Sequence, residues 1–277
     1  MQNQIVESKR TLYIPSEFAK QSLIYLQEVG KSKSLEKHTS SRTRLDSFLF
    51  FIVLDGNGVL TYNNQTIKLT KGDCAFIDCK NKYSHTSNNW TIAWIHFNGN
   101  NVKNIYDKFI SRKGQNTFKT KQLTKYESII NEIYMISNSS DYMRDMNLYD
   151  KITSILTSIM SETIYVSEVN RKHKYNLKEI KDYIDENYIN NISLQELSDK
   201  FFINKFYLTR SFKDTYGTTI NNYILQKKIT KAKELLRFSD MNIETIANNC
   251  GIEDQNYFSR LFKKIEGITP KEYKRMW

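Results

Sequence analysis

The pattern of hydrophobic and polar positions changes character along the chain. From Ser47 to Phe97, runs such as FLFFIVL, CAFID and WTIAWIHF are separated by turn signals, among them DGNG at 55–58 and KGD at 71–73. Short strands joined by tight turns predict an antiparallel sandwich or small barrel. The central runs are apolar at successive positions, which indicates strands buried on both faces.

Beyond about Asn101 the hydrophobic period becomes helical. Two apolar stripes, separated by the polar break 138–141, predict two amphipathic helices in an antiparallel hairpin. This hairpin can pack on the barrel, on itself or on a second copy of the chain. The stripes consist of Tyr126, Ile129, Ile130, Ile133 and Ile136 in the first helix and Leu148, Ile152, Ile155, Leu156 and Ile159 in the second.

A polar, basic stretch, SEVNRKHKYN, has no apolar period and is predicted to be a linker. Everything after it is helical in period. We therefore predict an α+β protein with a sheet-and-hairpin domain at 1–166, a linker at 167–176 and an all-α domain at 177–277. In the last domain Ser193 is expected to cap a helix, with Glu196 reaching back as its capping-box partner.

The all-α domain contains an internal repeat. An offset of 49 residues aligns Leu197 with Ile246 and Ile203 with Ile252. An offset of 50 residues aligns Tyr207, Arg210, Phe212, Lys213, Gly217, Thr219 and Tyr223 with Tyr257, Arg260, Phe262, Lys263, Gly267, Thr269 and Tyr273. Two helix-turn-helix units, each laying its second helix in a DNA major groove, are the simplest account.

The helix between the two units supplies a length check. About 18 residues at 1.5 Å rise span about 27 Å, near enough to the roughly 34 Å of one DNA turn for both units to read one face of a duplex. Helical geometry places apolar side chains inward and leaves arginine, glutamine and asparagine outward. These side chains form paired hydrogen bonds with guanine or adenine edges.

Composition narrows the function. The 277 residues carry a formal net charge of +11, which favours an anionic partner, nucleic acid before membrane. Within the all-α domain the charge alternates: residues 203–238 hold eight basic and two acidic side chains, and residues 179–200 hold two and six. The three cysteines are an odd number without a CxxC pair, which predicts reduced thiols and no metal site. The sequence has no signal peptide and no long apolar run, which predicts a cytoplasmic location and no membrane contact.

The segment QNYFSRLFKKIEGITPKEYKR at 255–275 resembles the signature of the AraC family of bacterial transcription regulators, and Ser193 to Gly217 resembles its companion motif. The resemblance implies seven C-terminal helices, a homodimer through helices near 121–137 and 142–165, and RNA polymerase as a partner, as for an activator. It places base contacts at Phe206, Thr209, Arg210, Gln255, Asn256, Ser259 and Arg260. Phosphate contacts would then fall on Lys213, Thr219, Lys263 and Thr269. Ser198 and Phe202 depart from the family's usual Ala and Gly.

The segment DGNGVLTYNNQTIKLTKGD, followed by WTIAWIHFNG, resembles the cupin-type effector domain of the same family, an antiparallel β-barrel. Thr61, Tyr62 and Asn63 stand where metal-binding cupins carry a His-x-His pair, so no metal and no cofactor are expected. The resemblance implies a small-molecule effector, often a sugar. Candidate effector-binding residues are Arg42, Arg44, His85, Trp94 and His96, each of which also fits a purely structural role.

The sequence thus predicts a cytoplasmic, sequence-specific DNA-binding regulator without enzymatic activity. An activator that senses a small molecule is the favoured form, with residues 1 to about 20 as a lid or arm. Two alternatives stay open: a cupin-fold carbohydrate-modifying enzyme with a helical appendage, and a non-specific architectural DNA-binding protein.

Overall fold

The computed structural model describes residues 6–113, 115–170 and 176–276. The chain divides into two compact units, Met1–Lys172 and His173–Trp277, which are described separately. The linker predicted at 167–176 begins too early, because α4 continues to Asn170; residues 171–175 lie outside the described part, and Asn176 caps the next helix.

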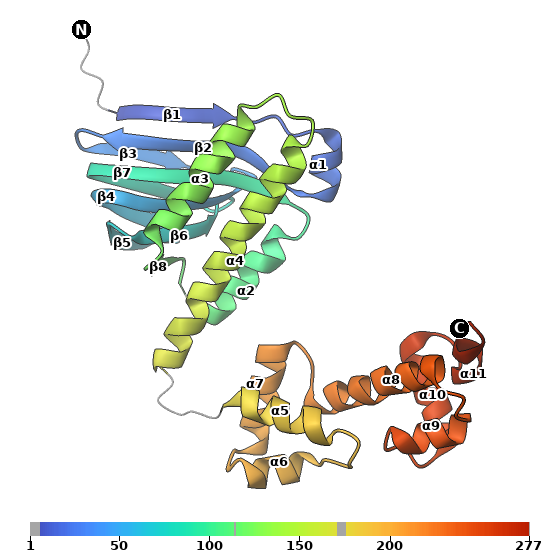
Figure 1. Ribbon diagram of the computed structural model, residues 1–277. Coiled ribbons are helices and arrows are strands. Elements are labelled where there is room, and N and C mark those ends of the chain that lie inside the picture. The colour runs from blue at the N-terminus through green and yellow to red at the C-terminus, as the bar shows by residue number, and fades with distance from the viewer. Residues whose placement is uncertain (1–5, 114, 171–175, 277) are drawn as a thin grey trace. The chain divides into compact units, whose positions relative to one another are not determined.

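The N-terminal unit is built on one antiparallel sheet of eight strands (Figure 1). Its backbone pairing follows the order β1-β2-β7-β4-β6-β8, with β3 added to β7 and β5 added to β4. The strands are β1 (Val6–Leu12), β2 (Ile24–Ser34), β3 (His38–Arg42), β4 (Phe48–Tyr62), β5 (Gln65–Thr70), β6 (Asp73–Asp78), β7 (Tyr83–Gly99) and β8 (Thr117–Lys119). The predicted antiparallel, cupin-like fold is confirmed, in the form of a curled sheet that strand pairing does not close into a barrel.

Two long strands, β4 and β7, make the curl possible, because different partners pair with their two halves. The first half of β4 pairs with β6 and its second half with β5, while β7 pairs with β3 and then with β2. Register shifts in the β4–β7 pairing between Val53 and Asn57 bend both strands. Strands β1 to β3 were not predicted from the sequence.

Each face of the sheet has its own apolar core. Phe48, Phe50 and Ile52 point to the convex face, where α2 (Val102–Lys113), α3 (Leu123–Ser137) and α4 (Arg144–Asn170) pack. Leu49, Phe51 and the remaining alternate residues line the concave face. The predicted stripes of α3 and α4 are largely buried against the sheet and each other, so the hairpin packs within its own unit (Figure 1). A short helix, α1 (Glu17–Ser22), precedes β2.

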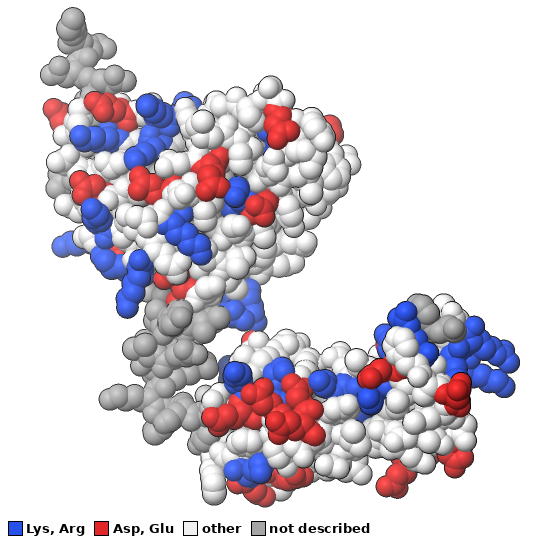
Figure 2. All heavy atoms as spheres, viewed as in Figure 1, with Lys and Arg blue, Asp and Glu red and all other residues white. Residues whose placement is uncertain are grey.

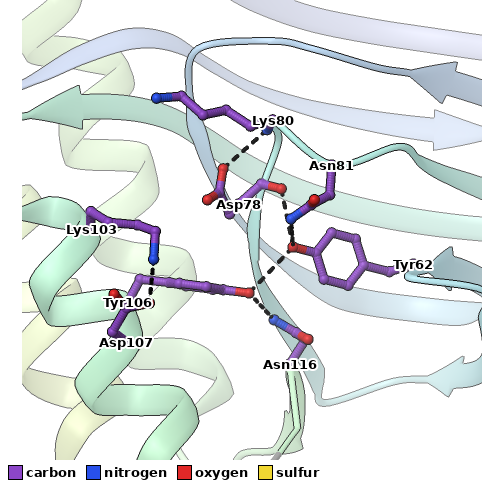
Figure 3. Close-up of polar contacts among 8 residues, drawn as sticks. All are labelled: Tyr62, Asp78, Lys80, Asn81, Lys103, Tyr106, Asp107 and Asn116. Atoms are coloured by element: carbon purple, nitrogen blue, oxygen red, sulfur yellow. Dashed lines mark hydrogen bonds and ion pairs between the residues drawn. The ribbon is translucent and has the colours of Figure 1, made fainter.

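A polar network centred on two buried tyrosines, Tyr62 and Tyr106, attaches α2 to the sheet (Figure 3). The Tyr62 hydroxyl donates to the Asp78 carbonyl at 3.1 Å and lies 3.3 Å from the Tyr106 hydroxyl of α2. The side-chain amides of Asn81 and Asn116 donate to these two hydroxyls at 3.1 and 2.6 Å. Because its polar atoms are paired with one another, we interpret this network as structural.

The C-terminal unit contains seven helices within the described residues, as predicted. They are α5 (Leu177–Asn187), α6 (Leu194–Lys200), α7 (Lys205–Tyr216), α8 (Ile220–Phe238), α9 (Ile243–Asn249), α10 (Gln255–Glu266) and α11 (Pro270–Arg275). Helix α8 joins the two helix-turn-helix units (Figure 1). Ile220 and Ile224 at its start belong to the core of the first unit, whereas Ile229, Ala232 and Leu236 belong to the core of the second.

Capping at the helix termini follows the repeat, with one correction. Asn204 and Asp254 each accept two backbone N–H bonds at the start of α7 and α10, and Gly217 and Gly267 end those helices in the left-handed conformation. The predicted capping box at Ser193 is wrong in one half: Ser193 accepts from the Glu196 N–H, but the Glu196 carboxylate instead accepts from the Tyr183 hydroxyl at 3.0 Å.

Candidate DNA-binding surface and ligand cavity

The repeat in the sequence is a repeat in three dimensions. Phe212 meets Tyr223 edge to face with ring centroids 5.6 Å apart, and Phe262 meets Tyr273 in the same way at 5.5 Å. The rows of buried and exposed residues along α7 and α10 match position by position at the 50-residue offset. Both units therefore present the same face of their second helix.

The turns between the helices of each unit use the same hydrogen bonds. Ile203 N–H donates to the Ser198 carbonyl, and Ile252 N–H donates to the Ala247 carbonyl, each across a left-handed residue. That residue is Gly251 in the second unit but Phe202 in the first, with φ of 69° and 52°. The Ser198 hydroxyl also donates to the Ile203 carbonyl at 2.6 Å, an additional bond across the first turn.

Most of the predicted base-contacting side chains lie on the solvent-exposed faces of α7 and α10. Phe206, Arg210, Gln255, Asn256 and Arg260 are exposed, and Thr209 and Ser259 are half-buried beside them. Arg210 is weakly held by Asp214 at 4.0 Å. Within the described part of the chain, Arg260 has no ion pair, so its guanidinium is available to an acceptor.

The four predicted phosphate contacts divide into two kinds. Lys213 and Lys263 are exposed lysines near the C-terminal ends of α7 and α10. Thr219 and Thr269 cap α8 and α11, where each hydroxyl accepts a backbone N–H bond. The Thr269 hydroxyl also donates to the Glu272 carboxylate at 2.7 Å, so its proton is already used within its own helix. The capping box expected at Ser193 occurs instead at Thr269.

Charge is unevenly distributed over the C-terminal unit. Figure 2 shows acidic side chains gathered over α5 and basic side chains around α11. The sequence places six basic and two acidic residues in 255–277. A basic surface attracts the phosphate backbone of nucleic acid and concentrates the protein near it.

A cavity of about 250 Å³ opens on the concave face of the curled sheet. Alternate residues of β1, β2, β3, β4 and β7 form its wall, because side chains two apart on a strand share a face. Cross-strand register brings distant residues into rows: Arg10 pairs with Gly30 and Gly30 with Trp94, while Glu28 pairs with His96. The lining residues are Val6, Ser8, Arg10, Glu28, Ser32, His38, Ser40, Arg42, Leu49, Phe51, Tyr83, His85, Ile92, Trp94 and His96.

Four of the five predicted effector residues therefore meet in one cavity: Arg42, His85, Trp94 and His96. Arg44 does not line it. Strand β3 ends at Arg42, and Arg44 has a positive φ of 56° in the following loop, so the two-residue alternation no longer holds there. Sequence reasoning missed the contributions of β1 and β2, chiefly Arg10 and Glu28.

Two histidines of the cavity, His85 and His96, are held in their neutral form. Burial, followed by the nearby Arg42 charge, lowers the pKa of both His85 and His96 from 6.5 to about 4. His96 Nδ1 lies 3.0 Å from the Ser47 hydroxyl. His85 Nδ1 is buried and has no hydrogen-bond partner within the described residues. A neutral imidazole offers one donor and one acceptor, which suits the hydroxyl groups of a ligand.

Trp94 owes its position to a glycine. A Cβ atom at Gly30 would lie 2.5 Å from Trp94 Cζ2, so only glycine leaves room for the indole against β2. The half-buried ring thus forms part of the cavity wall. An aromatic face beside polar groups can stack against the apolar face of a sugar ring.

Across the described ranges, no cluster of three His, Cys, Asp or Glu side chains is arranged to hold a metal ion. Cys74, Cys79 and Cys250 are buried free thiols. None of the helices in the described part of the chain combines the length and apolar character needed to cross a membrane.

Comparisons with known proteins agree with this two-part architecture. A model of the AraC-like ligand binding domain matches residues 25–142, and a model of a helix-turn-helix domain matches residues 197–276. The chain is 22% identical to the Msm operon regulatory protein of Streptococcus mutans, over 89% of this chain and 90% of that protein. It is 24% identical to the lactose operon transcription activator of Staphylococcus xylosus, over 80% and 82%.

Among solved structures, the C-terminal domain of the two-component response regulator yesN from Fusobacterium nucleatum is 40% identical. The match covers 36% of this chain and 98% of that one, with a TM-score of 0.35.

The ligand-binding domain and the double helix-turn-helix domain together define a DNA-binding transcription regulator. The chain belongs to the AraC family of such regulators, as the resemblance predicted. The family match supports a non-enzymatic regulator and not the carbohydrate-modifying enzyme considered as an alternative.

Proposed function

We propose that this protein is a transcription activator that reads a specific operator with α7 and α10 and responds to a small molecule bound in the cavity of its N-terminal unit. The repeated, exposed face of α7 and α10 carries this proposal. Relatives named as transcription activators, including the lactose operon activator and the activator RhaS of Escherichia fergusonii, support the direction of control.

DNA recognition is assigned to the two exposed helices. Arg210 and Arg260 occupy the same position in both units and suit paired hydrogen bonds with guanine, while Gln255 and Asn256 suit adenine. Phe206, which is 86% exposed, offers stacking or a thymine-methyl contact. Thr209 and Ser259 complete the base-reading set beside them, and Lys213 and Lys263 hold phosphates.

Arg260 and Lys263 provide a test with matched variants. Arg260→Ala is expected to lose about 1–3 kcal/mol of discrimination at one operator position, because a bidentate base contact disappears. Lys263→Ala should weaken binding to cognate and random duplexes alike and reduce the salt slope by about one unit. Fluorescence anisotropy on both duplexes across a salt series measures the two effects.

Equal loss on cognate and random duplexes for Arg260→Ala would reject its assignment as a base contact. Equal affinity of the unaltered chain for both duplexes would instead favour the architectural DNA-binding alternative.

The effector is proposed to be a sugar or a close chemical relative of one. A cavity of about 250 Å³ is of monosaccharide size, and serine, histidine, glutamate and tryptophan side chains line it. Binding would shift an equilibrium between arrangements of the DNA-binding units. The segment before β2 is a candidate to transmit the shift, because Val6, Ser8 and Arg10 of β1 form one wall of the cavity.

We further propose a homodimer that acts in the cytoplasm together with RNA polymerase. Met135, Tyr142, Met143 and Met146 expose apolar surface at the loop between α3 and α4, and Tyr142 is 93% exposed. An apolar patch of this kind is typical of a protein interface. Sedimentation of Tyr142→Glu against the unaltered chain would test it: loss of the dimer is expected, and an unchanged dimer would place the interface elsewhere.

A further inference from the structure

The charges around the ligand cavity do not cancel. Arg10 and Arg42 both line it, and Glu28 is the carboxylate that faces them. Arg10 Nη1 lies 3.7 Å from the Glu28 carboxylate, so these two charges offset each other. The Arg42 guanidinium has neither an ion pair nor a hydrogen bond to any residue that the structure describes.

Arg42 is directed by its strand toward the polar part of the cavity. It pairs with Tyr83 across β3 and β7, and Ser40 pairs with His85, so Arg42, Ser40, Tyr83 and His85 share one face of the sheet. The positive charge of Arg42 helps to lower the pKa of both His85 and His96, and it therefore lies within electrostatic reach of them. His85 and His96 stay neutral and add no second charge.

We propose that the effector carries one carboxylate, which Arg42 binds, on a small hydroxylated skeleton such as a sugar acid. One uncompensated positive charge matches a monoanion, and a planar guanidinium matches the two oxygens of a carboxylate. A phosphate ester would bring close to two negative charges at neutral pH and leave one of them unpaired in this cavity. This inference rests on the proposed effector role of the cavity and specifies its ligand class.

The remaining lining groups account for the hydroxylated skeleton. His85 Nδ1 lacks a partner among the described residues, and the hydroxyls of Ser8, Ser32 and Ser40 face the same space. Glu28 can accept a hydrogen bond from a ligand hydroxyl while it remains beside Arg10. Trp94 offers an aromatic face for the apolar side of a ring.

Calorimetric titration of the full chain tests the ligand class. The probes are four hexuronates, their neutral parent hexoses, gluconate, glucose 6-phosphate and glucosamine. At least one carboxylate is expected to bind ten times more tightly than its neutral parent. Arg42→Gln should reduce that preference to less than twofold, and Arg42→Lys should restore part of it.

Arg44→Gln is the matched control, since Arg44 is an exposed arginine two residues away that does not line the cavity. It should leave the preference unchanged. The proposal is overturned if no carboxylate binds, if a neutral hexose or the phosphate ester binds as tightly, or if Arg42→Gln and Arg44→Gln behave alike. Thermal melting of each variant establishes that it is folded.

Selection of duplexes from a random DNA pool, performed both without any probe and with each probe present, separates this inference from the proposed function. If a duplex is selected but no acid binds, the ligand class is wrong and the regulator stands. If an acid binds through Arg42 but no specific duplex is recovered, the proposed DNA recognition fails while the ligand class stands.

Discussion

At the scale of single residues, the two helix-turn-helix units differ most at the residue with left-handed backbone conformation in the turn between their helices. Gly251 is required there: a Cβ atom would lie 1.8 Å from the Ile189 carbonyl oxygen. Phe202 occupies the matching position with φ of 52° and its side chain 86% exposed. A non-glycine residue in this conformation is strained by about 1–2 kcal/mol, and the exposed ring returns little packing energy.

Phe202→Gly is therefore expected to stabilise the C-terminal unit by about 0.5–1 kcal/mol, the relieved strain less the greater freedom of glycine in the unfolded chain. Urea unfolding followed by circular dichroism measures the change. Phe202→Ala is the control, because it removes the ring but keeps the Cβ atom. If alanine stabilises as much as glycine, exposure of the ring and not backbone strain is the cause.

At the scale of elements, one carboxylate connects the first helix of the C-terminal unit to α8. Asp185 of α5 accepts hydrogen bonds from Lys181 and the Tyr223 hydroxyl, each at 2.6 Å, and lies 3.2 Å from Lys227 Nζ. Burial alone would raise the pKa of Asp185, but these hydrogen bonds outweigh it and lower the pKa to about 2. Tyr273 is the counterpart of Tyr223 in the second helix-turn-helix unit. Its ring packs near Lys233.

Asp185→Asn is expected to cost about 1–2 kcal/mol of unfolding free energy at pH 7, after allowance for partial exposure of the site. The folded pKa lies below the unfolded value of 3.8, so the contribution is complete above about pH 4 and is lost as the pH falls toward 2. Guanidinium unfolding at several pH values checks this. In Asp185→Asn the unfolding free energy should no longer fall between about pH 4 and pH 2 by the amount that Asp185 contributes. If the unfolding free energy of the variant depends on pH as that of the unaltered chain does, Asp185 is not the group responsible.

At the scale of the whole molecule, the neutral histidines make the N-terminal unit sensitive to acid. The folded pKa of His85 and His96 is about 4, below the usual 6.5. As the pH falls from about 6.5 to 4, the unfolded chain binds protons that the folded chain excludes, so stability decreases. Above pH 6.5 both states carry neutral histidines and the effect is absent.

Between pH 7 and pH 5 we expect a loss of about 1–2 kcal/mol for each of these histidines. Trp90 and Trp94 both belong to the N-terminal unit, so their fluorescence during urea unfolding reports on it; Trp277→Phe removes the tryptophan of the other unit. The double variant His85→Gln, His96→Gln should show a flatter pH profile. A profile as steep as that of the unaltered histidines would assign the pH dependence to other groups.

Helices and strands could be predicted from the sequence only where at least one of their faces packs on an apolar core. The helices of the C-terminal unit bury apolar residues on one face and expose polar residues on the other, so the helical spacing of apolar residues could be recognised in the sequence. Strands β1 and β3 put Ser8, Arg10, His38 and Ser40 toward a polar cavity, so both of their faces are polar and no alternation marks them.

The cavity shows the same limit at the level of the site. His96 and Trp94 could be associated because they lie two apart on one strand. Arg10 and Glu28 join them only through cross-strand register, which a local pattern does not contain. Arg44 was wrongly grouped with Arg42 because the sequence did not reveal that the strand ends between them.

Helix α8 has a consequence for the angle between the two reading helices. Its two halves belong to different cores, and buried Lys228, at their boundary, donates to the Gly251 carbonyl at 2.7 Å. Each residue added to α8 would turn the second unit by about 100° around the helix axis while advancing it by only 1.5 Å. The length of α8 thus fixes the angle between α7 and α10 around the axis of α8. The operator must present the two sites that these helices contact at a matching angle around the DNA axis.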